Sequence, residues 1–416
     1  MEKDDEFDIK ISGVQDEQEA HKSPTTIVVD DSPDDRYSRL RLIPWWDQER
    51  MRAARVMVVG AGAIGNEIIK NLALLGIGRI FVVDMDRIEN SNLTRSILYR
   101  ASNEGDFKSE VAAQKAMEIN PDILVQAFNG NVVYDLGLGV FRHMDVVLGG
   151  LDNREARLGI NQACWKVNKP WVDGAIEALN GIARVFTPPD GPCYECTMNE
   201  TDFKMLNQRR SCALLSRDEM LTGKVPTTPT TSSVIAGIQV QEAIKLIHAR
   251  SDLPTLAGKG FFFNGLTHDS YVVSYERKDF CQSHETFDNI IETGMSAKST
   301  TLQQALGWVK KQLGPNSVLD FGREMVTSLE CSQCAKPTNI FKQLGQVSET
   351  EGRCPVCGEM RIPRLTHSVT GDEPYLNLTL AEAGVPLFDI LTGRDGNKMI
   401  YFELTGDRQE ALGILA

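Results

Sequence analysis

A glycine-rich turn and a following acid stand where a nucleotide could bind. The turn Gly60-Ala61-Gly62-Ala63-Ile64-Gly65 follows an apolar run at 56–59 and opens a stretch whose apolar residues have helical spacing. Glycines let the backbone approach a phosphate, toward which the first N–H groups of a helix point. Asp84 ends the next apolar run, about 20 residues on, where a carboxylate can bind ribose hydroxyls. The sequence therefore predicts a nucleotide site that contains Gly60, Gly62, Gly65 and Asp84.

Beyond Asp84 the chain carries acids, amides and cations that suit phosphate chemistry. Residues 84–95 read Asp-Met-Asp-Arg-Ile-Glu-Asn-Ser-Asn-Leu-Thr-Arg, and Lys108 and Leu151-Asp152-Asn153 come later. When a carboxylate attacks the α-phosphate of ATP, cations must neutralise the developing charge and a metal ion must hold the pyrophosphate. Hydride transfer has no use for such a set. An NAD-dependent oxidoreductase, which the glycine turn alone suggests, is therefore disfavoured.

Segment 84–95 resembles the signature of the MoeB/ThiF/ubiquitin-activating enzyme superfamily. The resemblance continues at Gly105-Asp106-Phe107-Lys108, Ile119-Asn120-Pro121, Leu151-Asp152-Asn153 and Ile235-Ala236-Gly237, and it covers residues 36–285. It implies an adenylate-forming enzyme with ATP and Mg²⁺ as cofactors. In this resemblance Asp84 binds the ribose, Asp152 binds Mg²⁺ with help from Asp86, and the phosphates are addressed by Asn92, Arg95 and Lys108.

The resemblance also implies a dimer. Arg39, in Arg36-Tyr37-Ser38-Arg39, matches an arginine that reaches into the neighbouring subunit's site in this family. We therefore expect a homodimer with two composite sites, in which Arg39 acts as a catalytic cation together with Arg95 and Lys108.

The elements that must position these residues follow from apolar patterning. Runs at 56–59, 80–84 and 146–148 predict buried parallel strands, and they alternate with helical patterns that include 161–167. This alternation predicts a doubly wound, Rossmann-like α/β sheet. Downstream, the pattern predicts a long helix over 234–248, a hairpin over 260–278, helices over 300–313 and 378–391, and a strand over 399–404.

Changes of composition divide the chain into three parts. Residues 1–35 are rich in Asp, Glu, Ser and Pro, which predicts a disordered acidic arm. Residues 36–285 would form the adenylation domain, with a crossover loop at about 197–233 by its resemblance to the family. Residues 286–416 would form a small C-terminal α/β domain that contains a zinc ribbon.

Six of the nine cysteines fall in three C-x-x-C pairs. Two knuckles about 20 residues apart, Cys331/Cys334 and Cys354/Cys357, predict a zinc ribbon. The third pair, Cys193/Cys196, follows Gly191-Pro192 as in the family's zinc knuckle, and that resemblance implies Cys281 and His284 as its partners. A rival pairing of Cys193/Cys196 with Cys331/Cys334 would leave Cys354 and Cys357 without partners, so two zinc ions per chain are expected.

The other two cysteines have different expectations. Cys164 lies among apolar residues on a predicted helix, where a buried free thiol is usual. Cys212 falls in the interval that carries the thioester cysteine in the protein-ligating branch of the family. Arg209 and Arg210 beside it would favour the thiolate. The chain departs from the common pattern, since Ala213 follows Cys212 and Pro226 is distant, so an ordinary loop cysteine stays an alternative.

Charge and hydropathy exclude several classes of protein. The net charge of -13 disfavours nucleic-acid binding. The sequence has no run near the roughly 20 apolar residues of a membrane span and no apolar core of a signal peptide. These observations predict a cytoplasmic protein without membrane contact.

The leading hypothesis is an enzyme that adenylates the C-terminal glycine carboxylate of a ubiquitin-like protein. It would then form a thioester on Cys212 and pass the modifier to a conjugating enzyme. The alternative is a sulfur-carrier adenylyltransferase of the MoeB/ThiF type, or a tRNA-modifying relative, without the thioester step. An inactive partner subunit of the same fold is disfavoured because the phosphate-binding residues are all retained.

Overall fold

The computed structural model describes residues 35–204, 226–334 and 336–416. Their contacts divide the chain into two compact units, Met1–Trp46 and Asp47–Ala416. In the first unit, the helix α1 (Ser38–Arg41) forms one turn, and Arg41 is paired with Asp35. Within the described ranges, none of the helices has the length and apolarity needed to cross a membrane.

Among the described residues of the second unit, eight strands form one sheet in the order β3-β2-β1-β4-β5-β6-β7-β8. Strands β1 to β5 are parallel where they pair, and β6, β7 and β8 extend the sheet in antiparallel fashion. The strands are β1 (Arg55–Val59), β2 (Arg79–Val83), β3 (Leu124–Phe128), β4 (Val146–Gly149), β5 (Trp171–Glu177), β6 (Asn180–Phe186), β7 (Lys259–Asn264) and β8 (Asp269–Ser274). The predicted doubly wound α/β fold is confirmed.

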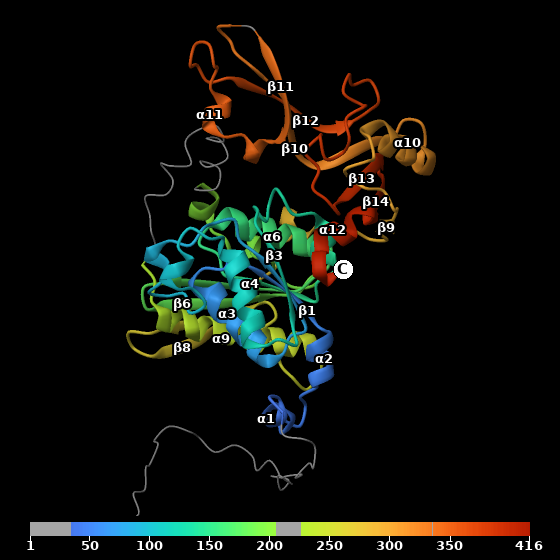
Figure 1. Ribbon diagram of the computed structural model, residues 1–416. Helices are drawn as coiled ribbons and strands as arrows, with labels where there is room; N and C mark the ends of the chain where they lie inside the picture. The colour runs from blue at the N-terminus through green and yellow to red at the C-terminus, as the bar shows by residue number, and fades with distance from the viewer. Residues whose placement is uncertain (1–34, 205–225, 335) are drawn as a thin grey trace, which may run out of the picture. The chain divides into compact units, whose positions relative to one another are not determined.

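Helices cover both faces of this sheet (Figure 1). One face carries α3 (Ala63–Leu75), α4 (Lys108–Ile119) and α9 (Pro229–His248), which pack together through α3. The other face carries α5 (Leu138–Arg142) and α6 (Arg154–Lys166). Helix α9 begins five residues before its predicted start, because Thr228 caps it and Pro229 fits its first turn. The short helix α2 (Gln48–Ala53) precedes β1.

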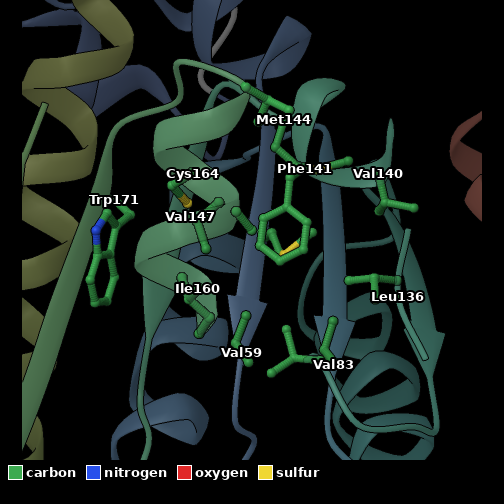
Figure 2. Packing of buried hydrophobic residues seen from close by; sticks show 14 of the residues in the cluster. Val59, Val83, Leu136, Val140, Phe141, Met144, Val147, Ile160, Cys164 and Trp171 are labelled. Atoms are coloured by element: carbon green, nitrogen blue, oxygen red, sulfur yellow. The ribbon is translucent and has the colours of Figure 1, made fainter. Parts of the chain in front are cut away.

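The core beneath α5 and α6 is apolar and continuous (Figure 2). Phe141 and Met144 come from the region of α5, Ile160 and Cys164 come from α6, and both groups pack over the sheet. Cys164 is fully buried, and this burial raises the pKa of its thiol. The prediction of a buried free thiol at this position is confirmed.

The remainder of the second unit forms another sheet, in the order β11-β10-β13-β14-β9, with β12 also paired to β10. Helix α10 (Leu302–Leu313) packs against it with a capping box at Thr301. The other elements are β9 (Ile291–Glu292), β10 (Val318–Glu330), β11 (Pro337–Gln343), α11 (Glu349–Gly352), β12 (Ile362–Val369), β13 (Ile390–Asp395), β14 (Lys398–Glu403) and α12 (Arg408–Leu412). The predicted helix over 300–313 and strand over 399–404 are confirmed; the three-part division of the chain stays a prediction.

The helix predicted over 378–391 is wrong. This segment forms turns and then enters β13 at Ile390. Gly384 has a φ of +87° and Phe388 a φ of +56°, neither of which a helix accepts. Pro386 also lacks the N–H that a helix interior requires. The leucines that gave the segment its helical pattern instead fill the core of the second sheet, where Leu380 and Leu391 are buried.

The two sheets share an interface within the second unit. Phe388 and Ile390 lie in the same buried cluster as Phe141 of α5. Arg142 is paired with Glu403, which is fully buried, at 2.7 Å. An apolar cluster with a partly buried ion pair at its edge joins the second sheet to the first.

Candidate nucleotide and zinc sites

The nucleotide-site residues meet because three neighbouring strands end together. Val59 is in register with Val83 on one side and with Gly149 on the other. Asp84, Gly60 and the loop that contains Asp152 therefore lie side by side at the carboxyl edge of the sheet. This edge is where doubly wound folds bind ligands.

The three glycines of the turn have different structural roles. Gly60 has a φ of +90°, and a Cβ there would lie 2.6 Å from the carbonyl oxygen of Gly150. A Cβ at Gly65 would lie 1.8 Å from the carbonyl oxygen of Gly60, so α3 could not pack on the turn. Gly62, the N-cap of α3, faces open space. The packing thus requires Gly60 and Gly65, while Gly62 leaves room for a phosphate at the helix N-terminus.

Asp84 is tied to the turn. Its carboxylate accepts hydrogen bonds from the N–H of Ala61 at 2.7 Å and from the N–H of Asp86 at 2.8 Å. Burial raises the pKa of Asp84, while the charge of Lys108 and these two N–H groups oppose the rise. The carboxylate is thus held in one orientation beside the glycine turn, as a ribose ligand must be.

Lys108 lies at the same place. Its Nζ donates to Oδ2 of Asp86 at 2.8 Å, and its side chain is only 12% exposed, against 60% for Asp86. Asn92 instead caps a short 3-10 helix by accepting from the N–H of Glu89, and Arg95 donates to the carbonyl oxygen of Ser91. The structure thus joins Asp84, Asp86 and Lys108 in one cluster, while Asn92 and Arg95 make local contacts in the following loop.

Asp152 is exposed at the end of β4, and a buried ion network holds the residue before it. Arg157 donates to the carbonyl oxygen of Leu151 and, at 2.8 Å, to Oδ1 of Asp173. Arg184 donates to Oδ2 of the same carboxylate at 3.0 Å. Burial alone would raise the pKa of Asp173, but the charges of the two arginines hold it below its usual range. An ionised Asp173 thus anchors Arg157 against the Asp152 loop.

This network of Asp173, Arg157 and Arg184 was not predicted from the sequence. Asp173 is an isolated acid in the otherwise apolar and small run Trp171-Val172-Asp173-Gly174-Ala175. A carboxylate in the buried part of a strand must be paired, so Asp173 was itself a signal that cations come from elsewhere in the chain. Which arginines those are depends on tertiary packing.

The first cysteine set is assembled as expected. Ligand atoms of Cys193, Cys196, Cys281 and His284 all lie within 4.8 Å of one another. The sulfur of Cys193 lies 3.4 Å from that of Cys281, and the sulfur of Cys196 lies 3.4 Å from Nε2 of His284. Three sulfurs and one imidazole suit a closed tetrahedral zinc site. The His284 ring also packs on Trp165 of α6, with the ring centres 4.4 Å apart.

Protonation differs among the thiols of this set, because hydrogen bonds between the sulfurs raise the pKa of Cys193 to about 11 and also raise that of Cys281. Hydrogen bonds from Cys193 and then Cys281 lower the pKa of the Cys196 thiol. Burial lowers the pKa of His284, which favours the neutral imidazole. Thiolate and neutral imidazole are the forms that bind zinc.

The second set consists of Cys331, Cys334, Cys354 and Cys357, whose sulfurs also lie within 4.8 Å of one another. The first knuckle follows β10 and the second precedes β12. The rival pairing of Cys193/Cys196 with Cys331/Cys334 is therefore wrong. Four sulfurs in this arrangement suit a second structural zinc.

The structure does not test the roles of two predicted catalytic residues, Cys212 and Arg39. Cys212 lies outside the described residues. Arg39 is an exposed residue of α1 in the first unit. Their roles stay predictions.

A family model and several known proteins match this chain. A family model described as the ThiF family matches residues 35–283. A sulfur carrier protein adenylyltransferase of Thermus thermophilus is 38% identical over 170 residues, which cover 39% of this chain and 63% of that protein. Ubiquitin-like modifier-activating enzyme 5 of Arabidopsis thaliana is 29% identical over 245 residues, with 54% and 55% covered. The matched part is thus less than two thirds of either relative.

A solved structure supports the same fold. E. coli MccB with ATP superposes with a TM-score of 0.51 and 23% sequence identity, covering 61% of this chain and 75% of that chain. At this identity the likeness concerns the fold alone. The ThiF model spans well over half of the chain, and the glycine turn, Asp84 and Lys108 cluster within it. The chain therefore belongs to the ThiF family.

Proposed function

We propose that this protein adenylates the C-terminal glycine carboxylate of a small ubiquitin-like protein. The observation that carries the proposal is the convergence at one sheet edge of the glycine turn, the buried Asp84, the Asp86–Lys108 pair and the exposed Asp152. These groups supply what the reaction needs: a phosphate cradle, a ribose ligand, a cation and an exposed carboxylate for a metal ion.

The reaction follows from these positions. The glycine turn and the N-terminus of α3 hold the phosphates, and Asp84 orients the ribose. A carboxylate oxygen of the modifier attacks the α-phosphorus, the bond to pyrophosphate breaks, and an acyl-adenylate forms. Lys108, Arg95 and, from the neighbouring subunit, Arg39 neutralise charge in the transition state. Mg²⁺ bound by Asp152 and Asp86 would stabilise the departing pyrophosphate.

The test is exchange of labelled pyrophosphate into ATP. We expect exchange that requires Mg²⁺ and a ubiquitin-like protein ending in glycine, because only a reversible acyl-adenylate returns pyrophosphate to ATP. A version of the modifier that lacks its last glycine should not support exchange. Exchange that is independent of the modifier would contradict the proposal.

We further propose that Cys212 accepts the acyl group. A thiolate attacks the adenylate carbonyl carbon, AMP leaves, and a thioester remains that a conjugating enzyme could receive. Replacing Cys212 with alanine should retain pyrophosphate exchange and abolish the reductant-sensitive conjugate of enzyme and modifier on a non-reducing gel. Cys164→Ala is the matched control, because that thiol is fully buried in the core. If the conjugate persists in Cys212→Ala and is lost in Cys164→Ala, the acceptor is Cys164 and the assignment of Cys212 is wrong.

The second candidate is a sulfur-carrier adenylyltransferase without a thioester step. The Thermus relative carries that name and is 38% identical over the matched region. If the wild-type protein performs exchange with its modifier but never forms a conjugate, this candidate is favoured. For either candidate, we propose that the protein acts in the cytoplasm.

A homodimer with shared sites is the expected assembly, with Arg39 completing the partner's site. When inactive Arg39→Ala and inactive Asp152→Ala chains are mixed, one site of each mixed dimer keeps both residues. We expect the mixture to recover up to about a quarter of wild-type exchange, given random reassortment and additive sites. If tagged subunits demonstrably mix and exchange stays absent, Arg39 does not act between subunits.

A further inference from the structure

The zinc ribbon holds a short helix between its two knuckles. The 3-10 helix η5 (Leu344–Gln346) lies between Cys331/Cys334 and Cys354/Cys357, so the chain on both sides of it returns to the same cluster of sulfurs. Leu344 and Val347 pack with Val326 and Leu329 of β10. Helix η5 is thus fixed to the ribbon by its own small apolar core.

Helix η5 and the residue before it contact the turn 131–135, which follows β3 of the first sheet. Gln343 Nε2 donates to the carbonyl oxygen of Tyr134, and Gln346 Nε2 donates to Oδ1 of Asp135, both at 2.7 Å. The backbone of Gly345 meets the Tyr134 side chain so closely that a Cβ would lie 2.2 Å from its Oη. These contacts hold consecutive residues of the turn, and Gln343 is itself buried.

The turn 131–135 also contacts the segment that carries Asp84 and Asp86, and the first turn of α6, which follows Asp152. The Tyr134 hydroxyl donates to Oε1 of Glu155 at 2.6 Å, three residues after Asp152. The side-chain amide of Asn131 contacts the sulfur of Met85 at 3.8 Å, between Asp84 and Asp86. Oδ2 of Asp135 accepts from the N–H of Asn131 at 2.7 Å and closes the turn. A continuous set of contacts therefore runs from the ribbon to residues next to Asp84 and Asp86 and three residues after Asp152.

We propose that the zinc ribbon is a positioning element of the nucleotide site. Through η5 it fixes the turn 131–135, and that turn keeps the loops of Asp84 and Asp152 in the arrangement that binds ATP. This inference rests on the proposed function, since it names what orders the ATP site. A site that is ordered before binding loses less conformational entropy when the ligand binds, so its affinity is higher.

The test is the Gly345→Val variant. A Cβ at this position would overlap the end of the Tyr134 side chain, so either the Tyr134 ring or η5 must shift. We expect the affinity for a non-hydrolysable ATP analogue with Mg²⁺, measured by calorimetry, to fall about tenfold. Arg364→Ala is the matched control, because Arg364 is an exposed residue of the same ribbon that pairs only locally with Glu330. It should bind the analogue as the wild type does.

Two further measurements keep the test decisive. Amide hydrogen exchange should show lost protection at 131–135 in Gly345→Val and retained protection in Arg364→Ala. If Gly345→Val does not fold, Tyr134→Phe and Gln346→Ala remove single hydrogen bonds, and together they should also weaken binding of the analogue. If the wild type binds the analogue and the variants bind it equally tightly, the ribbon does not position the nucleotide site, and the proposed function is unaffected. A wild type that does not bind the analogue contradicts the proposed function as well.

Discussion

Replacing Asp152 with alanine is expected to lower ATP–pyrophosphate exchange by about a thousandfold, the scale of losing one main electrostatic group in the transition state. Asp152 is an exposed carboxylate beside the glycine turn, and Arg157 donates to the carbonyl oxygen just before it. Without this carboxylate, the metal ion that must neutralise the pyrophosphate has lost its main protein ligand. Pyrophosphate exchange measured with saturating modifier and varied Mg²⁺ checks this result.

The control for this variant is Asp252→Ala. Asp252 is an exposed carboxylate paired with Arg250, and it belongs to none of the proposed sites. It should leave exchange unchanged, and both variants should unfold at the wild-type temperature. Undiminished exchange in Asp152→Ala would reject Asp152 as the metal ligand while leaving the glycine turn and Asp84 as the nucleotide site.

Loss of the first zinc site should give the largest effect on stability. Cys193 and Trp165 are fully buried and pack together with Cys196, so ligands left without a metal would be uncompensated polar groups in a core. In Cys193→Ser we expect one zinc per chain instead of two. We also expect the unfolding temperature to fall by about 10 °C or more, since zinc binding contributes directly to folding. Elemental analysis and calorimetric unfolding measure both.

Two variants separate the zinc sites. Cys357→Ser should also leave one zinc, but with a smaller loss of stability, because Cys357 is exposed on the ribbon. Cys164→Ala should keep two zinc ions, since this thiol is no ligand. A well-folded wild-type protein with one zinc or none would contradict the assignment of the two sites.

The fold class and the nucleotide turn could be predicted because their signals are local. An apolar run followed by glycines and a helical pattern has few structural solutions. At Gly60 the local backbone itself requires glycine, since a φ of +90° disfavours any residue with a Cβ. The same local reasoning failed over 378–391. There the apolar spacing was compatible with a helix, but Gly384 and Pro386 break it and the leucines reach the core from turns.

The cysteine spacing predicted zinc knuckles and the pairing of Cys331/Cys334 with Cys354/Cys357, and the family resemblance implied Cys281 and His284 as the partners of Cys193/Cys196. Only the tertiary structure brings Cys281 and His284 to Cys193 and Cys196, in each case across 88 residues of sequence. Ligand distances within 4.8 Å then exclude the rival pairing. Spacing within a knuckle is fixed by a few backbone dihedrals, whereas pairing between knuckles depends on how whole elements pack.

The sequence by itself determined the α/β class, the glycine turn with its acid, and the zinc-binding residue types, because each arises from residues close together in the chain. Tertiary structure decided that Arg157 and Arg184 share the buried Asp173, and that Gln343 contacts Tyr134 across 209 residues. Arginine, glutamine and tyrosine are ordinary surface residues in most contexts. Their roles arise only when packing removes water from around them, because these side chains must then form hydrogen bonds with one another.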